Sequence, residues 1–242
     1  MKKIFLNLLI LGMGLFFACT PKPTPPLTKS SLWNKFIQHQ QQLNQISYFY
    51  LKGSAHVKKA NQNHRVIYTC FGQIKGILRV DISSSLGQIL SMWQVDTKKL
   101  LAFFPYENKA FISDNPNLNL SNWGYPLPFD LKMSINLLLA KINLDKLPEI
   151  NLKIKSNQNI FTLKNKKIVL YTNGLIKNIY FKNYKISYLA YELNTKYIYP
   201  KRICIFDKDK LILKIFQKEL KTKIKFQKLN IILPKKTIIF KM

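Results

Sequence analysis

The sequence predicts a mainly β fold, in which a curled antiparallel sheet forms an incomplete barrel and two helices lie over it as a lid. Runs of alternating apolar and polar residues recur roughly every 8–12 residues, and polar turn sequences separate them. Only two segments show helical spacing instead. A sheet of about a dozen strands must curl, and helices on one face then enclose a concavity.

Each helix is expected from a single apolar stripe. The first covers residues 31–46, with Gln40 interrupting its stripe, and the second follows Asp130, a suitable N-cap. Positions three and four residues apart share one helix face and would pack on the sheet. The stripes are Trp33, Phe36, Ile37, Leu43 and Ile46 in the first helix, and Leu131, Ile135, Leu138, Leu139 and Ile142 in the second.

The strands are expected from a period of two. In residues 51–58, Leu51, Gly53, Ala55 and Val57 form one face and polar residues form the other, as in a half-buried strand. Asn173-Gly174 predicts a two-residue hairpin turn between two later strands. Further strands are expected at 64–71, 77–83, 88–95, 100–105, 109–113, 168–171 and 175–181.

The N-terminus has the pattern of an export signal. Lys2 and Lys3 precede an apolar run that ends at Ala18-Cys19. We expect residues 1–18 to be a signal peptide and Cys19 to be the lipidated residue of a lipoprotein. The alternatives are an uncleaved anchor, or a plain signal peptide followed by an unrelated cysteine.

Residues 19–30 are expected to be a tether between the lipid and the folded domain. Four prolines between residues 21 and 26 favour extended polyproline geometry. Thr20 follows the cysteine, whereas Asp at that position is typical of bacterial lipoproteins that stay in the inner membrane. We therefore expect a lipid anchor in the outer membrane, with residues 31–242 forming one domain that faces the periplasm.

The charge is strongly positive, with 39 Lys and Arg against 11 Asp and Glu, for a net charge of +28. Such a surface favours anionic partners, although a codon bias of an AT-rich genome would also enrich lysine. Nucleic acid is excluded as the expected partner because the chain is exported. The only arginines, which suit bidentate phosphate recognition, are Arg65, Arg79 and Arg202.

Sequence motifs for catalysis are missing. The chain has no G-x-S-x-G, H-E-x-x-H, C-x-x-C or phosphate-binding glycine loop, and its three histidines and 11 acidic residues are scattered. We therefore expect a protein that is not an enzyme and that uses no cofactor or metal. Cys70 and Cys204 lie in strand-like runs and would be either a disulfide or two buried thiols.

A hydrophobic cavity is the candidate functional site. Apolar side chains from both helices and from the early strands would line it if the helices and the sheet do not close fully on each other. The alternative is an ordinary filled core. The candidate lining residues are Trp33, Phe36, Ile37, Leu78, Val80, Ile82, Leu90, Met92, Ile135, Leu138 and Leu139.

Several short segments, in order and at similar spacing, resemble the LolB family of outer-membrane lipoprotein receptors, within the wider LolA/LolB-like fold. They are 31–33 with 43–46, Gly53-Ser54-Ala55, 78–82 followed by Leu86-Gly87-Gln88, 124–128, and 171–174. The match ends near Phe216. Ser85 stands where the family usually has a proline.

The resemblance implies a binding and transfer protein. The family's partners would be a periplasmic LolA-like carrier, the acylated lipoprotein cargo and outer-membrane lipids, and we expect a monomer. Leu86 matches the exposed leucine that the family uses to insert cargo into the bilayer. The alternatives are a structural envelope lipoprotein and a divergent LolA/LolB-like binder of another lipid.

Overall fold

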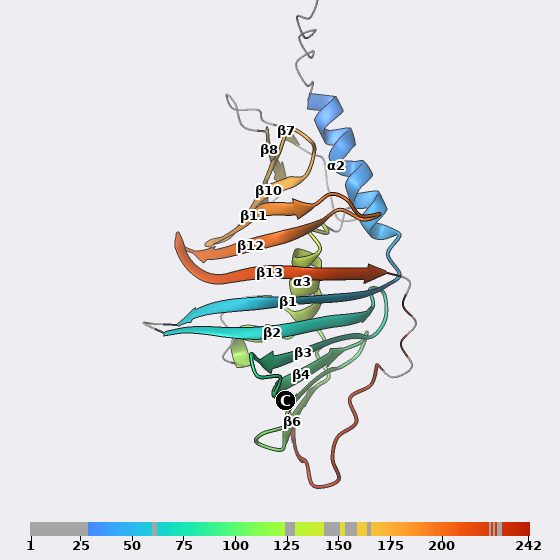
Figure 1. Ribbon diagram of the computed structural model, residues 1–242, viewed down its shortest axis with the longest axis vertical. Coiled ribbons are helices and arrows are strands. Elements are labelled where there is room, and N and C mark those ends of the chain that lie inside the picture. The colour runs from blue at the N-terminus through green and yellow to red at the C-terminus, as the bar shows by residue number, and fades with distance from the viewer. Residues whose placement is uncertain are drawn as a thin grey trace, which may run out of the picture.

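The computed structural model describes residues 29–59, 62–123, 129–142, 151–152, 159–163, 166–222, 224, 226 and 229–242. The expected signal peptide (1–18), the lipidation site Cys19, the first part of the tether and the segment 124–128 lie outside the described residues. The figures show the described part in colour (Figure 1).

One curled, open sheet dominates the described residues, and it confirms the expected mainly β fold class (Figure 1). The spatial order of its fourteen strands is β14-β6-β5-β4-β3-β2-β1-β13-β12-β11-β10-β9-β8-β7. The strands are β1 (Tyr48–Lys59), β2 (Gln62–Gln73), β3 (Leu78–Ser84), β4 (Ile89–Val95), β5 (Leu100–Phe104), β6 (Lys109–Ser113), β7 (Asn151–Leu152), β8 (Asn159–Leu163), β9 (Lys166–Leu170), β10 (Ile176–Phe181), β11 (Tyr184–Glu192), β12 (Tyr199–Asp207), β13 (Lys210–Thr222) and β14 (Ile238–Lys241).

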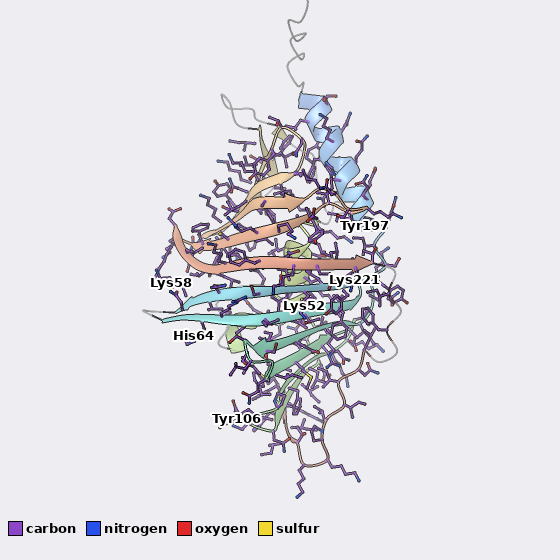
Figure 2. All side chains as sticks on the ribbon, viewed as in Figure 1. Lys52, Lys58, His64, Tyr106, Tyr197 and Lys221 are labelled. Atoms are coloured by element: carbon purple, nitrogen blue, oxygen red, sulfur yellow. The ribbon has the colours of Figure 1, made fainter. Side chains whose placement is uncertain are left out.

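The first thirteen strands pair antiparallel with their neighbours, and β14 pairs parallel with β6. The β1–β2, β3–β4, β5–β6, β10–β11 and β12–β13 turns therefore lie at one end of the sheet, which we call the turn end. In Figure 2, Lys58 and His64 mark this end, and Tyr197 and Lys221 lie at the opposite end.

Two α-helices and one short 3₁₀ helix complete the described part of the chain. They are α2 (Lys29–Asn44), η1 (Leu120–Trp123) and α3 (Leu131–Leu138). Asp130 caps α3 as expected, because its Oδ1 accepts a hydrogen bond from the Met133 amide at 2.7 Å. The helix ends before the expected Ile142, since Ala140 has a positive φ of 53°.

The helices cover different parts of the inner face. Trp33 and Phe36 of α2 pack against each other with ring centroids 4.9 Å apart, and Trp33 lies 5.0 Å from Phe161 of β8. The α3 helix lies behind the middle strands in Figure 1 and packs on β1–β3, β12 and β13. The expected pair of lid helices is therefore divided between two regions of the sheet.

The β9–β10 turn differs from the expected two-residue hairpin. The Tyr171 amide donates to the Leu175 carbonyl at 2.8 Å, which leaves a three-residue loop with Gly174 at φ +86°. Gly174 lies directly against α2, since a Cβ placed there would be 2.6 Å from Cβ of Lys35 and 2.9 Å from the amide nitrogen of Phe36. The loop is therefore a docking point for the helix.

The C-terminal segment covers the outer face of β4–β6. Ile231 is buried and packs with Phe103 and Ala110, and Met92 lies against this cluster. Further along, β14 extends the sheet beside β6, where Phe240 stacks on Phe111 with ring centroids 5.0 Å apart. Ile238, Ile239 and Phe240 remain partly exposed.

We predict that Gly174→Ala destabilises the protein more than Gly87→Ala. Both glycines have φ near +86°, so both alanines incur backbone strain, but a Cβ at Gly87 meets nothing within 4 Å. The strain alone should cost about 1 kcal/mol, and the clash with α2 should add at least as much at position 174. Urea unfolding of the two variants measures the difference. Equal destabilisation would contradict the tight contact between the loop and α2.

Candidate functional site

An apolar cavity of about 130 Å³ lies between α3 and the inner face of the sheet. A single water needs only ~10–15 Å³, and apolar cavities of about this size bind small apolar molecules. It is partly open to solvent. Its lining residues are Ala55, Val57, Val66, Tyr68, Cys70, Val80, Ile82, Trp93, Leu120, Phe129, Leu131, Ser134, Ile135, Leu137, Leu138, Ile203, Ile205, Leu213 and Ile215.

The period of two along the strands places these side chains on one face. Ala55 pairs with Val66 on one side and with Ile215 on the other, so the three residues form a row across β2, β1 and β13. Ala55 is the smallest member of this row. Because its methyl group reaches only a short distance towards α3, the row leaves space beneath the helix.

The mouth of the cavity faces the turn end. Among the lining residues from the sheet, the half-buried ones are Ala55, Val57, Val66 and Ile82, and each lies within a few residues of a turn at that end. Ser134 and Leu138 of α3 are half-buried as well. Val66 pairs with Ser84, the last residue before the β3–β4 turn. Leu86 lies on this turn and is 95% exposed. The exposed leucine and the open side of the cavity therefore share one end of the sheet.

The structure brings together four of the expected lining residues: Val80, Ile82, Ile135 and Leu138. Leu78 and Leu139 are buried elsewhere in the core. Trp33, Phe36 and Ile37 lie on α2, away from the cavity, because that helix packs beside β8 and the β9–β10 turn.

The structure places Leu90 and Met92, two of the expected lining residues, away from the cavity. They lie on the opposite face of β4 from Ser91, Trp93 and Val95, which are the buried residues of that strand. Both faces of β4 carry apolar residues because the C-terminal segment covers its outer face near Met92. Trp93, which lines the cavity, takes the place that the sequence analysis gave to its neighbours.

Other lining residues were missed in the sequence analysis. Ile203, Ile205, Leu213 and Ile215 come from β12 and β13, whose apolar alternation was a usable signal. The alternation of apolar and polar residues could not indicate Phe129, because this residue precedes α3 in a segment without a regular period.

Four hydrogen bonds hold the C-terminal end of α3. Gln40 of α2, although it interrupts the apolar stripe, is buried and donates from Nε2 to the Ala140 carbonyl at 3.0 Å. Its Oε1 accepts from the Ile142 amide at 2.7 Å. The Tyr188 hydroxyl donates to the Leu137 carbonyl at 3.0 Å, and Nε2 of Gln217 donates to the Leu138 carbonyl at 2.6 Å. We call this group the α3 clamp.

The titratable groups at the cavity stay uncharged. Burial raises the pKa of the Tyr68 hydroxyl well above its usual value, and the neighbouring Cys70 adds to this rise. Burial also raises the pKa of the Cys70 thiol. Cys70 and Cys204 are both buried and free, so of the two alternatives the structure has the buried thiols.

Metal ligands do not gather in the part of the chain that the structure describes, where no group of three or more His, Cys, Asp or Glu side chains could hold an ion. Among the same residues, no helix combines the length and the apolar character needed to cross a membrane.

Comparisons with known proteins identify the fold. No family profile and no curated protein sequence matches the chain. A solved structure of a DUF1329 family protein from Desulfovibrio piger has a TM-score of 0.59 at 12% identity and covers 84% of this chain and 96% of its own. A LolA superfamily protein from Nitrosomonas europaea gives 0.54 at 12% identity, with coverage of 81% and 94%.

A third solved structure is a putative outer membrane lipoprotein-sorting protein domain from Vibrio parahaemolyticus. Its TM-score is 0.55 at 9% identity, and the match covers 83% of this chain and 95% of that domain. Together with the curled open sheet and its two helices, these similarities show that the chain has a LolA/LolB-like fold.

We predict that Gln40→Leu destabilises the protein and loosens α3. Leucine has nearly the same side-chain volume as glutamine, but it leaves the Ala140 carbonyl and the Ile142 amide without their hydrogen-bond partner. This loss should lower the free energy of unfolding by about 2 kcal/mol or more. Gln42→Leu is the control, because Gln42 lies on the exposed face of the same helix. Chemical denaturation gives the free energies, and hydrogen exchange should show faster exchange in α3. Equal stability of the two variants would contradict the clamp.

Proposed function

We propose that the chain is a lipid-anchored protein of the bacterial outer membrane, facing the periplasm. In this proposal it accepts the acyl chains of lipoproteins from a LolA-like carrier and inserts them into the membrane. The observation that carries the proposal is the apolar cavity under α3, which opens at the same end of the sheet as the exposed Leu86. Cys19, at the end of the N-terminal apolar run, is the proposed lipidation site.

The cavity volume sets a requirement for this activity. About 130 Å³ accommodates a small hydrocarbon group, so an acyl chain enters only if α3 moves outward. Burial of each methylene contributes about 0.8 kcal/mol, and a long chain gains on the order of 10 kcal/mol. This burial free energy is large enough to offset the cost of moving α3 outward, although four hydrogen bonds hold one end of the helix.

Transfer without an energy source requires that the acyl chains never enter water. The carrier and this protein must therefore join their cavity mouths, and the receiving cavity must bind the chains more tightly. The basic surface helps in this step, because it attracts an acidic carrier or anionic lipid over several ångströms. The fold similarity to a protein named as a lipoprotein-sorting domain supports the same class of function.

A structural envelope lipoprotein is the second candidate, favoured by the lysines of the outer face. Lys52 and Lys221 lie on that face (Figure 2). Several cations lie over aromatic rings, among them Lys214 at 5.1 Å from the Phe216 centroid. Such a protein would bind anionic glycolipid through this face and would need no cavity.

We predict that Ala55→Leu reduces binding of a fluorescent acyl probe at least tenfold. The larger side chain would fill space beneath α3, and filling a cavity leaves stability unchanged or raises it. Ala190→Leu makes the same change at an exposed position of β11 and serves as the control. Probe titration and thermal unfolding distinguish the outcomes: a stable Ala55→Leu variant that binds as well as the Ala190→Leu variant would place the acyl site elsewhere.

We predict that Leu86→Glu stops delivery of a lipoprotein to liposomes while the cargo still binds. A carboxylate on the turn opposes insertion into the bilayer, but Leu86 contributes nothing to the cavity wall. Leu193→Glu is the matched control, because Leu193 is also exposed but follows β11 at the opposite end of the sheet. Cargo transfer and cargo retention are measured side by side. Normal delivery by Leu86→Glu would remove the insertion role, and loss of cargo binding would place Leu86 in the cargo site.

A further inference from the structure

The C-terminal segment, residues 229–242, displays an apolar surface away from the cavity, at the bottom of Figure 1. It carries five of the eleven large hydrophobic side chains that are exposed in the described part of the chain. Soluble proteins rarely gather so much exposed apolar surface unless it contacts another molecule. The five are Ile232, Ile238, Ile239, Phe240 and Met242, with exposed fractions from 41% for Phe240 to 75% for Ile232.

This exposure does not come from a loose end of the chain. The amide of Ile231 donates to Oε1 of Gln94 at 2.8 Å, and the Ile231 side chain is buried against β5 and β6. Ile232, the next residue, is exposed instead. At the far end of the segment, the Met242 amide donates to the Ile112 carbonyl at 2.9 Å. The segment is therefore held at both ends and presents its apolar side chains to the outside.

Asn108 joins the segment to the β5–β6 turn. Its Nδ2 donates to the Lys236 carbonyl at 2.9 Å, and its own carbonyl accepts from the Ile238 amide at 3.0 Å. Tyr106 lies on the same turn and is 86% exposed (Figure 2). Because the β5–β6 turn belongs to the turn end, Tyr106 and the turn at 234–237 lie together at the end where the cavity opens.

The charge of this surface is positive. Residues 229–242 contain Lys235, Lys236 and Lys241 and no acidic residue, and all three lysines are exposed. On the β5–β6 turn, the Glu107 carboxylate is already paired with Lys109, at 3.0 Å from its Nζ. Exposed apolar and aromatic side chains beside lysines are typical of surfaces that lie in the headgroup region of an anionic bilayer.

The same charge argues against a second copy of the chain as the partner. Two copies joined at this surface would bring both sets of lysines together without acidic partners, and each copy has a net charge of +28. Anionic phospholipid, in contrast, supplies both the negative charge for the lysines and an apolar layer for the isoleucines.

The free edge of β14 limits how deeply the segment can enter a bilayer. The amides of Ile238 and Met242 bond to carbonyls beside and within β6, so Ile239 and Lys241 direct their backbone groups to the open edge of the sheet. Unpaired backbone groups are costly in the hydrocarbon core. The strand therefore fits the headgroup region, where water and lipid oxygens can bond to it.

We infer that residues 229–242, together with the β5–β6 turn, bind the surface of an anionic phospholipid bilayer. Ile232 and Tyr106 enter the headgroup region, and the lysines of the segment contact lipid phosphates. This contact goes beyond the proposed function, since it uses neither the acyl cavity nor Leu86 and requires no cargo. It holds the turn end, and with it the cavity mouth, against the membrane.

The test uses the full chain with a tryptophan in the segment, which reports local contact whether or not the N-terminus also binds the vesicles. Ile232→Trp is compared with Leu193→Trp, at an exposed position at the opposite end of the sheet. Vesicles of phosphatidylcholine and phosphatidylglycerol with brominated acyl chains should shift the emission of Ile232→Trp to shorter wavelength and quench it about twofold. Leu193→Trp should respond only as the unchanged chain does.

A charge reversal in the Ile232→Trp chain tests the role of the lysines. Lys236→Glu should lower the ratio of quenched to unquenched tryptophan about tenfold, because a lysine contact with the anionic surface is lost and a repulsion replaces it. Lys196→Glu is the control, since it makes the same change at an exposed lysine of the opposite end, where salt screens the interaction beyond ~8–10 Å.

Equal responses of Ile232→Trp and Leu193→Trp would overturn the inference. Equal effects of Lys236→Glu and Lys196→Glu would overturn it as well, because the surface would then have no preference for anionic lipid. Binding of the fluorescent acyl probe is measured on the same variants and should stay unchanged in all of them. Failure of the membrane contact is thereby distinguished from failure of the proposed acyl-binding function.

Discussion

The position of α3 depends on a few buried polar side chains rather than on its short apolar stripe. Eight residues of helix contribute little stability by themselves, and most of the stability of such a helix comes from tertiary contacts. The clamp from Gln40, Tyr188 and Gln217 holds the last carbonyls, each bond contributing about 0.5–1.5 kcal/mol net. Because it acts only at the C-terminal end, the N-terminal half of α3 can lie over the cavity without filling it.

Most of the basic residues have no acidic residue with which to form an ion pair. Since 39 basic residues face 11 acidic ones, at least 28 cannot be paired one to one. On the outer face, several of these cations lie over aromatic rings and form cation–π contacts. Arg202 and Lys214, for example, both contact the ring of Phe216. Each such contact is worth about 0.5–1 kcal/mol at an exposed site, and the lysine stems cover the rings from water. The outer face is thereby cationic and stable, while the inner face stays apolar.

The fold could be predicted from the sequence because its signals are local. The alternation of apolar and polar residues predicted the bounds of strands β2 to β6 to within about two residues. Asp130 correctly indicated where α3 begins. The site was less accessible. The apolar stripe of α2 predicted burial but not its partner, which is β8 rather than the cavity wall. In β4 both faces are apolar, so periodicity could not choose between Met92 and Trp93. From the sequence, Gln40 only interrupts the apolar stripe of α2. Its structural role could not be predicted, because its hydrogen-bond partners are 100 and 102 residues away. The cavity volume is the small difference between the space enclosed by α3 and the sheet and the volume of the side chains in that space. The order of residues in the sequence does not give this difference.

The central claim is that acyl chains bind between α3 and the sheet, and methyl NMR tests it most directly. In protein labelled at the Ile methyl groups, addition of an acylated peptide should give nuclear Overhauser contacts from the acyl methylenes to Ile135, Ile205 and Ile215. Ile37, on α2, supplies the internal reference and should show none. Contacts confined to Ile37, or to the exposed Ile89, would contradict the account and place the acyl chain outside the cavity.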